Sequence, residues 1–129
     1  MIEIKISFGE LVDKLTILEI KISKIKDQSK LLKAKNEYEL LQKIYKNCVN
    51  TNDKQLIDLK MNLLKTNTKL WEVEDKLRIL EKNQIFNDEF IQLARSVYFL
   101  NDERFENKNS INKHLKSEIN EVKEYIEYK

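Results

Sequence analysis

The chain has 129 residues and a mass of 15.5 kDa, which predicts one domain with a single core over residues 1–129. It contains no proline and one glycine, so a turn-rich β-sandwich and a glycine-cradled phosphate site are disfavoured. The net charge is only +2 and the lysines are interleaved with acids. This argues against nucleic-acid binding, because a nucleic-acid face carries charges of one sign.

The sequence gives no sign of secretion or membrane insertion. Cys48 is the only cysteine, so an intramolecular disulfide is impossible and a cytoplasmic setting is favoured. We interpret this thiol as a small core residue. No stretch approaches about 18 consecutive apolar residues, so no membrane span is expected. Residues 1–7 also lack the apolar segment of a signal peptide.

The first six residues alternate apolar and charged side chains. Isoleucines at positions 2, 4 and 6 flank Glu3 and Lys5, a period of two that is typical of a strand. A single strand is not stable alone, so it must pack on the helices as an extended arm or pair with a second copy of itself. We predict the packed arm.

Two helices are expected next. Residues 7–10 form a capping box, in which the Ser7 hydroxyl and the Glu10 carboxylate each pair with the other residue's amide, and this predicts a helix over 8–26. That helix is apolar on nearly all sides, as expected for a central helix or one that faces a second subunit. Ser29 is the predicted N-cap of a helix over 30–48, and the asparagine-rich residues 47–53 predict a loop.

A third helix is predicted over 53–82, about 45 Å at 1.5 Å per residue, which is longer than the second helix can cover. Asn87 caps a fourth helix over 88–114, and Ser117 caps a short one over 118–127. The predicted fold is all-α: an antiparallel bundle of four main helices, an extended N-terminal arm over 1–6 and a short C-terminal helix. A homodimer is expected, because the third helix is long and the first is apolar on both sides.

A cluster of polar side chains lies mostly in the second half of the chain, beside apolar helix ridges. It includes all three arginines, whose guanidinium groups can pair bidentately with carboxylate or phosphate. Three interpretations stay open: a solvated surface, a buried network that fixes helix register, or a site for an anion. The predicted cluster comprises Glu19, Trp71, Glu74, Arg78, Arg95, Tyr98, Asn101, Asp102 and Arg104.

Two bases lie near the end of the predicted fourth helix. Arg104 and Lys108 are four residues apart and repel each other, so burying them requires acids from another helix. Glu19 and Glu74 are the predicted partners. Three residues are instead assigned to the solvated surface: Glu106, Lys108 and Asn109.

Enzyme templates fit poorly, so a non-catalytic protein is favoured and no catalytic residue, metal or cofactor is assigned. Two acid pairs have the i, i+3 spacing that helical magnesium-dependent hydrolases use, although such pairs arise by chance in so charged a chain: Glu10 with Asp13, and Glu72 with Asp75. His114 is the only histidine, which argues against zinc or a histidine-activated nucleophile. A mutase that positions a dicarboxylate with arginines and lysines stays open.

Three stretches resemble the signature blocks of a bacterial family of small all-helical proteins of unknown function. They are ISFGELVDKLTILEIKISKI (6–25), LWEVEDKLRILE (70–81) and FIQLARSVYFLNDERFENKNSIN (90–112), and SEINEVKEY near the C-terminus is similar to the family's ending. The resemblance implies no activity, but it implies a place near surface-glycan and glycosyltransferase genes. The polar residues shared with the family's signature are Glu10, Asp13, Lys14, Glu19, Trp71, Glu74, Asp75, Arg78, Arg95, Tyr98, Asn101, Asp102 and Arg104.

These observations predict a cytoplasmic helical protein that binds a protein partner or a small anionic ligand through the polar cluster, in surface-glycan assembly as the resemblance implies. All three arginines are expected to lie near acids of other helices, with Trp71 and Tyr98 as walls of the site. The rival hypothesis is a small magnesium-dependent nucleotide or nucleotide-sugar hydrolase. It requires the four paired carboxylates to converge on one metal.

Overall fold

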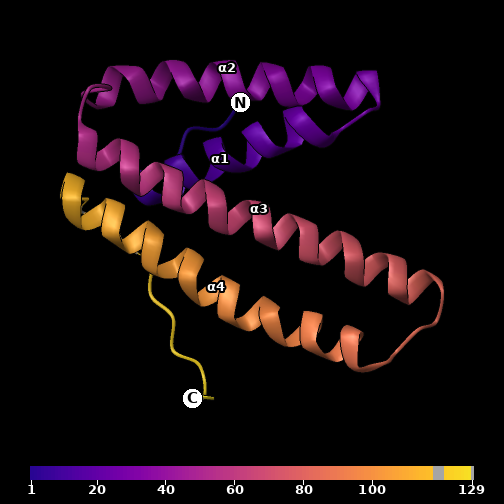
Figure 1. Cartoon of the computed structure of the whole chain (residues 1–129). Helices are drawn as coiled ribbons and strands as arrows, with labels where there is room; N and C mark the ends of the chain where they lie inside the picture. Colours follow the sequence, from indigo (N-terminus) through magenta and orange to yellow (C-terminus); the bar gives the residue numbers. More distant parts are fainter. Residues whose placement is uncertain (118–120, 129) are drawn as a thin grey trace.

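The computed structural model describes residues 1–117 and 121–128, and this part of the chain holds four helices and no strand. The helices are α1 (Phe8–Lys24), α2 (Gln28–Cys48), α3 (Lys54–Lys82) and α4 (Asp88–Leu115) (Figure 1). The predicted all-α bundle of four main helices is confirmed. Within the described residues, no helix is both long and apolar enough to cross a membrane.

α1 is the central helix and packs against each of the other three. Its Val12 and Leu15 are fully buried together with Leu56 and Leu63 of α3 and Ile111 of α4. Burying one such side chain stabilises the fold by about 1.5–3 kcal/mol. The apolar residues on most sides of α1 therefore have partners within the same chain.

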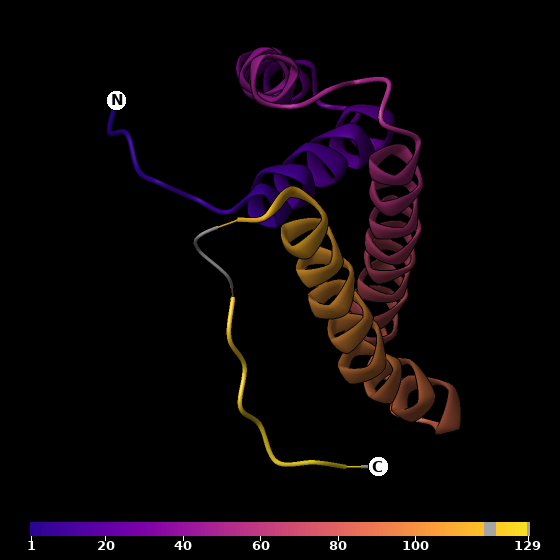
Figure 2. The same cartoon turned by 90° about the vertical axis from the view of Figure 1, so that its left-hand side faces the viewer.

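α3 and α4 form a long antiparallel hairpin (Figures 1 and 2). They have 29 and 28 residues, so α4 covers a helix that α2 is too short to cover. Among the described residues, α2 packs closely on α1 alone, and Figure 2 shows it at the edge of the molecule. The far half of the hairpin extends beyond α1 and has no third helix over it (Figure 1).

Three side chains cap the first, second and fourth helices. The caps at Ser7 and Asn87 are those predicted, and each side-chain oxygen accepts from a backbone amide at 3.1 Å. The prediction for α2 is wrong: its N-cap is Asp27, whose Oδ1 accepts from the Lys30 amide at 3.0 Å, and Ser29 lies inside the first turn. Both residue types cap well, so the sequence signal did not separate them.

Cys48 is exposed at the end of α2, so its predicted place in the core is wrong. The core position nearest this end of the helix belongs to Tyr45, which is buried. Since α2 contributes one narrow face to α1, most of its surface is left in solvent.

Both ends of the described chain differ from expectation. Residues 1–6 form the predicted extended arm, but Ile2 and Ile4 are 91% and 76% exposed, and the arm extends out from the start of α1 with a groove between it and α2 (Figure 2). Of the helix predicted over 118–127, residues 118–120 lie outside the described part, and residues 121–128 are not helical. Short helices need tertiary packing, and Val122 and Ile126 are 85% and 93% exposed.

Candidate functional site

α1 and α4 cross closely at Gly9. A Cβ here would lie 2.5 Å from the carbonyl oxygen of Lys108 and 2.9 Å from Oδ1 of Asn112, so only glycine fits. The Gly9 amide donates to Asn112 Oδ1 at 2.7 Å, and the Phe8 amide donates to Ser117 Oγ at 3.0 Å. Side chains from α4 and beyond thus satisfy amides that a helix start leaves free. The crossing fixes α1 against α4.

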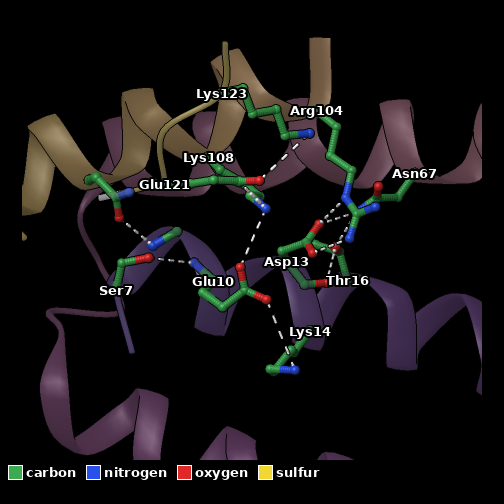
Figure 3. Close-up of polar contacts among 12 residues, drawn as sticks. Ser7, Glu10, Asp13, Lys14, Thr16, Asn67, Arg104, Lys108, Glu121 and Lys123 are labelled. Carbon is green, nitrogen blue, oxygen red and sulfur yellow. Dashed lines mark hydrogen bonds and ion pairs between the residues drawn. The ribbon is translucent and has the colours of Figure 1, made fainter. Parts of the chain in front are cut away.

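Two acids of α1 meet two bases of α4 beside this crossing (Figure 3). Asp13 accepts from Arg104 bidentately, with Nε at 2.9 Å from Oδ1 and Nη2 at 2.6 Å from Oδ2. Glu10 Oε2 lies 3.3 Å from Lys108 Nζ. The side chains of Asp13 and Lys108 are only 1% and 8% exposed. Burying these neighbouring cations therefore does require acids from another helix, as predicted.

The Asp13 carboxylate also joins α3. Asn67 Nδ2 donates to Asp13 Oδ1 and to Thr16 Oγ1, both at 2.9 Å, and both Asn67 and Thr16 are buried (Figure 3). The Thr16 hydroxyl in turn donates to the Asp13 carbonyl at 2.8 Å. A buried polar network whose members are satisfied holds its elements in one register. This one ties α1, α3 and α4 together.

The ion pairs shift the pKa values of their members. The hydrogen bond with Asp13 raises the pKa of Arg104, against the opposing effect of burial. Burial alone would lower the pKa of Lys108, but the hydrogen bond with Glu121 and the charge of Glu10 leave that pKa raised. Burial would likewise raise the pKa of Glu121, and its pairing with Lys108 lowers it. Lys108 therefore stays charged and links the C-terminal tail (residues 121–128) to α1.

A groove of about 390 Å³ opens beside the network, between α1, α3 and α4. Arg104 is part of both the network and the groove, because it pairs with Asp13 and also lines the groove. The volume lies within the range of about 300–1,000 Å³ found for small-molecule sites, which are mostly apolar with a few polar groups. The groove is lined by Ile17, Ile20, Asn67, Leu70, Trp71, Glu74, Asp75, Arg78 and Arg104.

Comparison with known proteins bears on what this site does. A family model described as a family of unknown function, DUF6165, matches residues 2–128. The chain belongs to the DUF6165 family. No curated protein and no solved structure matches it. The resemblance to a family of unknown function is thereby confirmed. Because the family has no assigned function, the function of this DUF6165 chain is inferred from the geometry of its site.

Four of the nine residues of the predicted cluster line the groove of this DUF6165 protein: Trp71, Glu74, Arg78 and Arg104. Of the three arginines, only Arg104 lies against an acid of another helix within the described residues, and this acid is Asp13, not Glu19 or Glu74. Arg78 is exposed and has no ion-pair partner among the described residues. The prediction that all three arginines lie near acids of other helices therefore holds for one of them, Arg104.

The remaining five members do not line the groove: Glu19, Arg95, Tyr98, Asn101 and Asp102. Glu19 pairs instead with Lys60 at 3.3 Å. Arg95 is exposed and donates a hydrogen bond to Gln92 of its own helix at 3.4 Å. Tyr98 is also exposed and does not form a wall of the groove. Arg95 and Tyr98 lie in the first half of α4, and among the described helices no third helix covers this part of the hairpin.

Sequence reasoning missed the centre of the network. Lys108 was assigned to the solvated surface and is buried, and Asp13 was assigned to the family's polar signature and to a possible metal site but not to the polar cluster. A usable signal existed in the spacings: two acids three residues apart on α1, and two bases four residues apart on α4. Each spacing places both charges on one helix face, so the two faces are complementary when the helices run antiparallel.

The carboxylates required by the hydrolase hypothesis do not assemble. Within residues 1–117 and 121–128, no group of three or more histidines, cysteines, aspartates and glutamates could hold a metal ion. Glu10 and Asp13 are each paired with a cation of α4, Asp75 lines the groove and Glu72 is exposed. With both Asp13 oxygens held by a guanidinium, no observation favours this second function.

Proposed function

We propose that this DUF6165 protein is a non-catalytic binding protein, and that the groove between α1, α3 and α4 accepts a small ligand with a flat apolar part and one anionic group. The carrying observation is that Trp71 and Arg78 line one groove while Arg78 has no ion-pair partner among the described residues. An indole packs well against a flat apolar group. A free guanidinium pairs bidentately with a carboxylate or phosphate.

The rest of the lining supports the size and polarity of this ligand. Ile17, Ile20 and Leu70 provide apolar surface. Glu74 and Asp75 lie in the same lining and repel further negative charge, so a ligand with one anionic group is favoured over a polyanion. A groove of about 390 Å³ suits a small molecule better than a protein helix.

The cellular setting belongs to the same proposal. The chain carries a single cysteine, which supports a cytoplasmic location. The resemblance stated above implies neighbourhood to surface-glycan genes, which supports phosphorylated compounds of that chemistry as natural ligands. The first point rests on the sequence and the second on what the resemblance implies, and the groove chemistry stands without either.

Trp71 makes the proposal directly testable, because it is the only tryptophan and lines the groove. Tryptophan emission is followed while phenyl phosphate is added, with benzyl alcohol and benzylamine as neutral and cationic controls of similar size. We expect a saturable change with phenyl phosphate only. Arg78→Gln should weaken binding about tenfold or more, the loss expected for one hydrogen-bonded ion contact.

The matched control is Arg95→Gln, which removes an exposed arginine outside the groove and should leave the titration unchanged. A response to benzylamine equal to that for phenyl phosphate would show that the groove does not select an anionic group, and this would contradict the proposal. Binding that ignores Arg78→Gln would also contradict the proposal.

A further inference from the structure

The N-terminal arm and the outer face of α2 form a second apolar surface, separate from the proposed ligand groove. A groove of about 820 Å³ lies between them, and the arm lines it with its three isoleucines and also with Glu3 and Lys5. On the α2 side, Leu40 and Ile44 line it and are exposed. So many large apolar side chains exposed around one groove indicate an interaction site.

We propose that two copies of this chain associate through their arms, which pair as antiparallel strands about a two-fold axis at Ile4. In this register each Glu3 lies opposite the partner's Lys5, and each Ile2 lies opposite the partner's Ile6. The sequence of the arm is therefore its own complement in both charge and hydrophobicity. This inference goes beyond the proposed ligand binding and does not depend on it.

The alternation of the arm gives the paired ribbon two unlike faces. Successive strand residues point to opposite sides, so all isoleucines of both arms share one face and the Glu3–Lys5 pairs share the other. A two-stranded ribbon is marginal alone and becomes stable when an apolar face packs on a helix. The exposed Leu40 and Ile44 of α2 supply that helix face in the same groove.

Other pairings of the arm are disfavoured by the same side chains. A parallel pair in register would place Glu3 beside the partner's Glu3 and Lys5 beside the partner's Lys5, which like charges oppose. A shift by one residue would turn the isoleucines of one arm to the charged face. Because two-fold dimers require a self-complementary surface, a second copy is the occupant that this arm fits.

Single charge reversals test the register. Glu3→Lys gives an arm with two lysines, and Lys5→Glu gives an arm with two glutamates, so each variant should repel itself. The wild type should sediment at twice the 15.5 kDa chain mass at micromolar concentration, and each variant at the single mass. An equimolar mixture of the two variants should recover the doubled mass, as should the combined variant Glu3→Lys/Lys5→Glu.

The control for folding is built into these variants, because both substituted residues are exposed on the arm, outside the helices. Circular dichroism and thermal unfolding of diluted samples should match for all of them. A wild-type particle of 15.5 kDa at every concentration would overturn the proposal. So would single reversals that form a dimer as stable as the wild-type dimer, since that dimer would not depend on the Glu3–Lys5 pairs.

A disulfide between arms tests the axis itself, in a Cys48→Ser background that removes the exposed native thiol. With Ile4→Cys, the two introduced thiols face each other at about 5 Å between Cα atoms, within disulfide reach. Oxidation should give a covalent dimer. With Ile2→Cys, the thiols lie about 14 Å apart at 3.4 Å per residue, and no such dimer should form. Equal cross-linking of both variants would refute the register.

Discussion

At the scale of single residues, the pair formed by Asp13 and Arg104 dominates the interior. The Asp13 side chain is 1% exposed and Arg104 is 31% exposed, so the acid depends on the arginine more than the reverse. A buried ion pair contributes little net stability compared with an apolar pair, but a buried charge that loses its partner is strongly destabilising. The pair therefore acts mainly to fix how α1 and α4 meet.

Replacing Arg104 by methionine tests this dependence, because methionine keeps much of the length and removes the charge. We expect the free energy of unfolding, measured by urea denaturation, to fall by about 3 kcal/mol as the Asp13 carboxylate loses its partner. The double variant Asp13→Asn/Arg104→Met should recover most of this loss, since asparagine still accepts from Asn67 and carries no charge.

Two arginines provide the matched comparison. Arg78→Met and Arg95→Met change exposed residues without an ion-pair partner among those described, so each should alter stability by no more than about 0.5 kcal/mol. Losses of similar size at all three arginines would mean that the position of Arg104 in the network is unimportant.

At the scale of helices, local signals predicted more than long-range ones. Ser7 and Asn87 each lie three residues before the amide that they cap, so the sequence alone identified both helix starts. The contact between Asp13 and Arg104 joins residues 91 apart, and the local spacings give each helix a charged face without stating which helices meet. α2 shows the limit of local reasoning, because two good capping residues, Asp27 and Ser29, stand two positions apart.

A pair of alanine substitutions separates these two caps. Asp27→Ala removes the oxygen that accepts from the Lys30 amide and should lower the free energy of unfolding by about 1 kcal/mol. Ser29→Ala should change it by less than about 0.5 kcal/mol, because Ser29 lies in the first turn, where alanine is a good helix former. Urea denaturation of both variants measures the difference, and a larger loss at Ser29 would restore the cap predicted from the sequence.

At the scale of the whole molecule, the architecture depends on where the long hairpin is held. The sequence predicted that α3 is too long for α2 to cover, and it left open whether the first and fourth helices or a partner chain cover the remainder. The structure assigns that role to α4. At the open end of the hairpin, a side-chain contact holds the start of α3 against the end of α4. There the N-cap of α3, Asp53, lies 2.6 Å from Nε2 of His114 in the last turn of α4.

This junction makes stability depend on pH. The hydrogen bond with His114, followed by that with the Leu56 amide, lowers the pKa of Asp53 from its ordinary 3.8. Pairing with Lys108 lowers the pKa of Glu121 from 4.5 in the same direction, against burial. A carboxyl group with a lowered folded-state pKa contributes stability that is present above its unfolded value and is lost as the pH falls through the folded value.

The free energy of unfolding, measured in urea at a series of pH values, should therefore be level from about pH 7 to about pH 5 and fall below about pH 4.5. Asp53→Asn keeps an oxygen that can cap α3 but cannot titrate. This variant should be less stable than the wild type at pH 7, because the charged partner of His114 is lost, and its decline in acid should be shallower. Identical slopes below pH 4.5 in both proteins would show that the contact between Asp53 and His114 does not hold the two helix ends together.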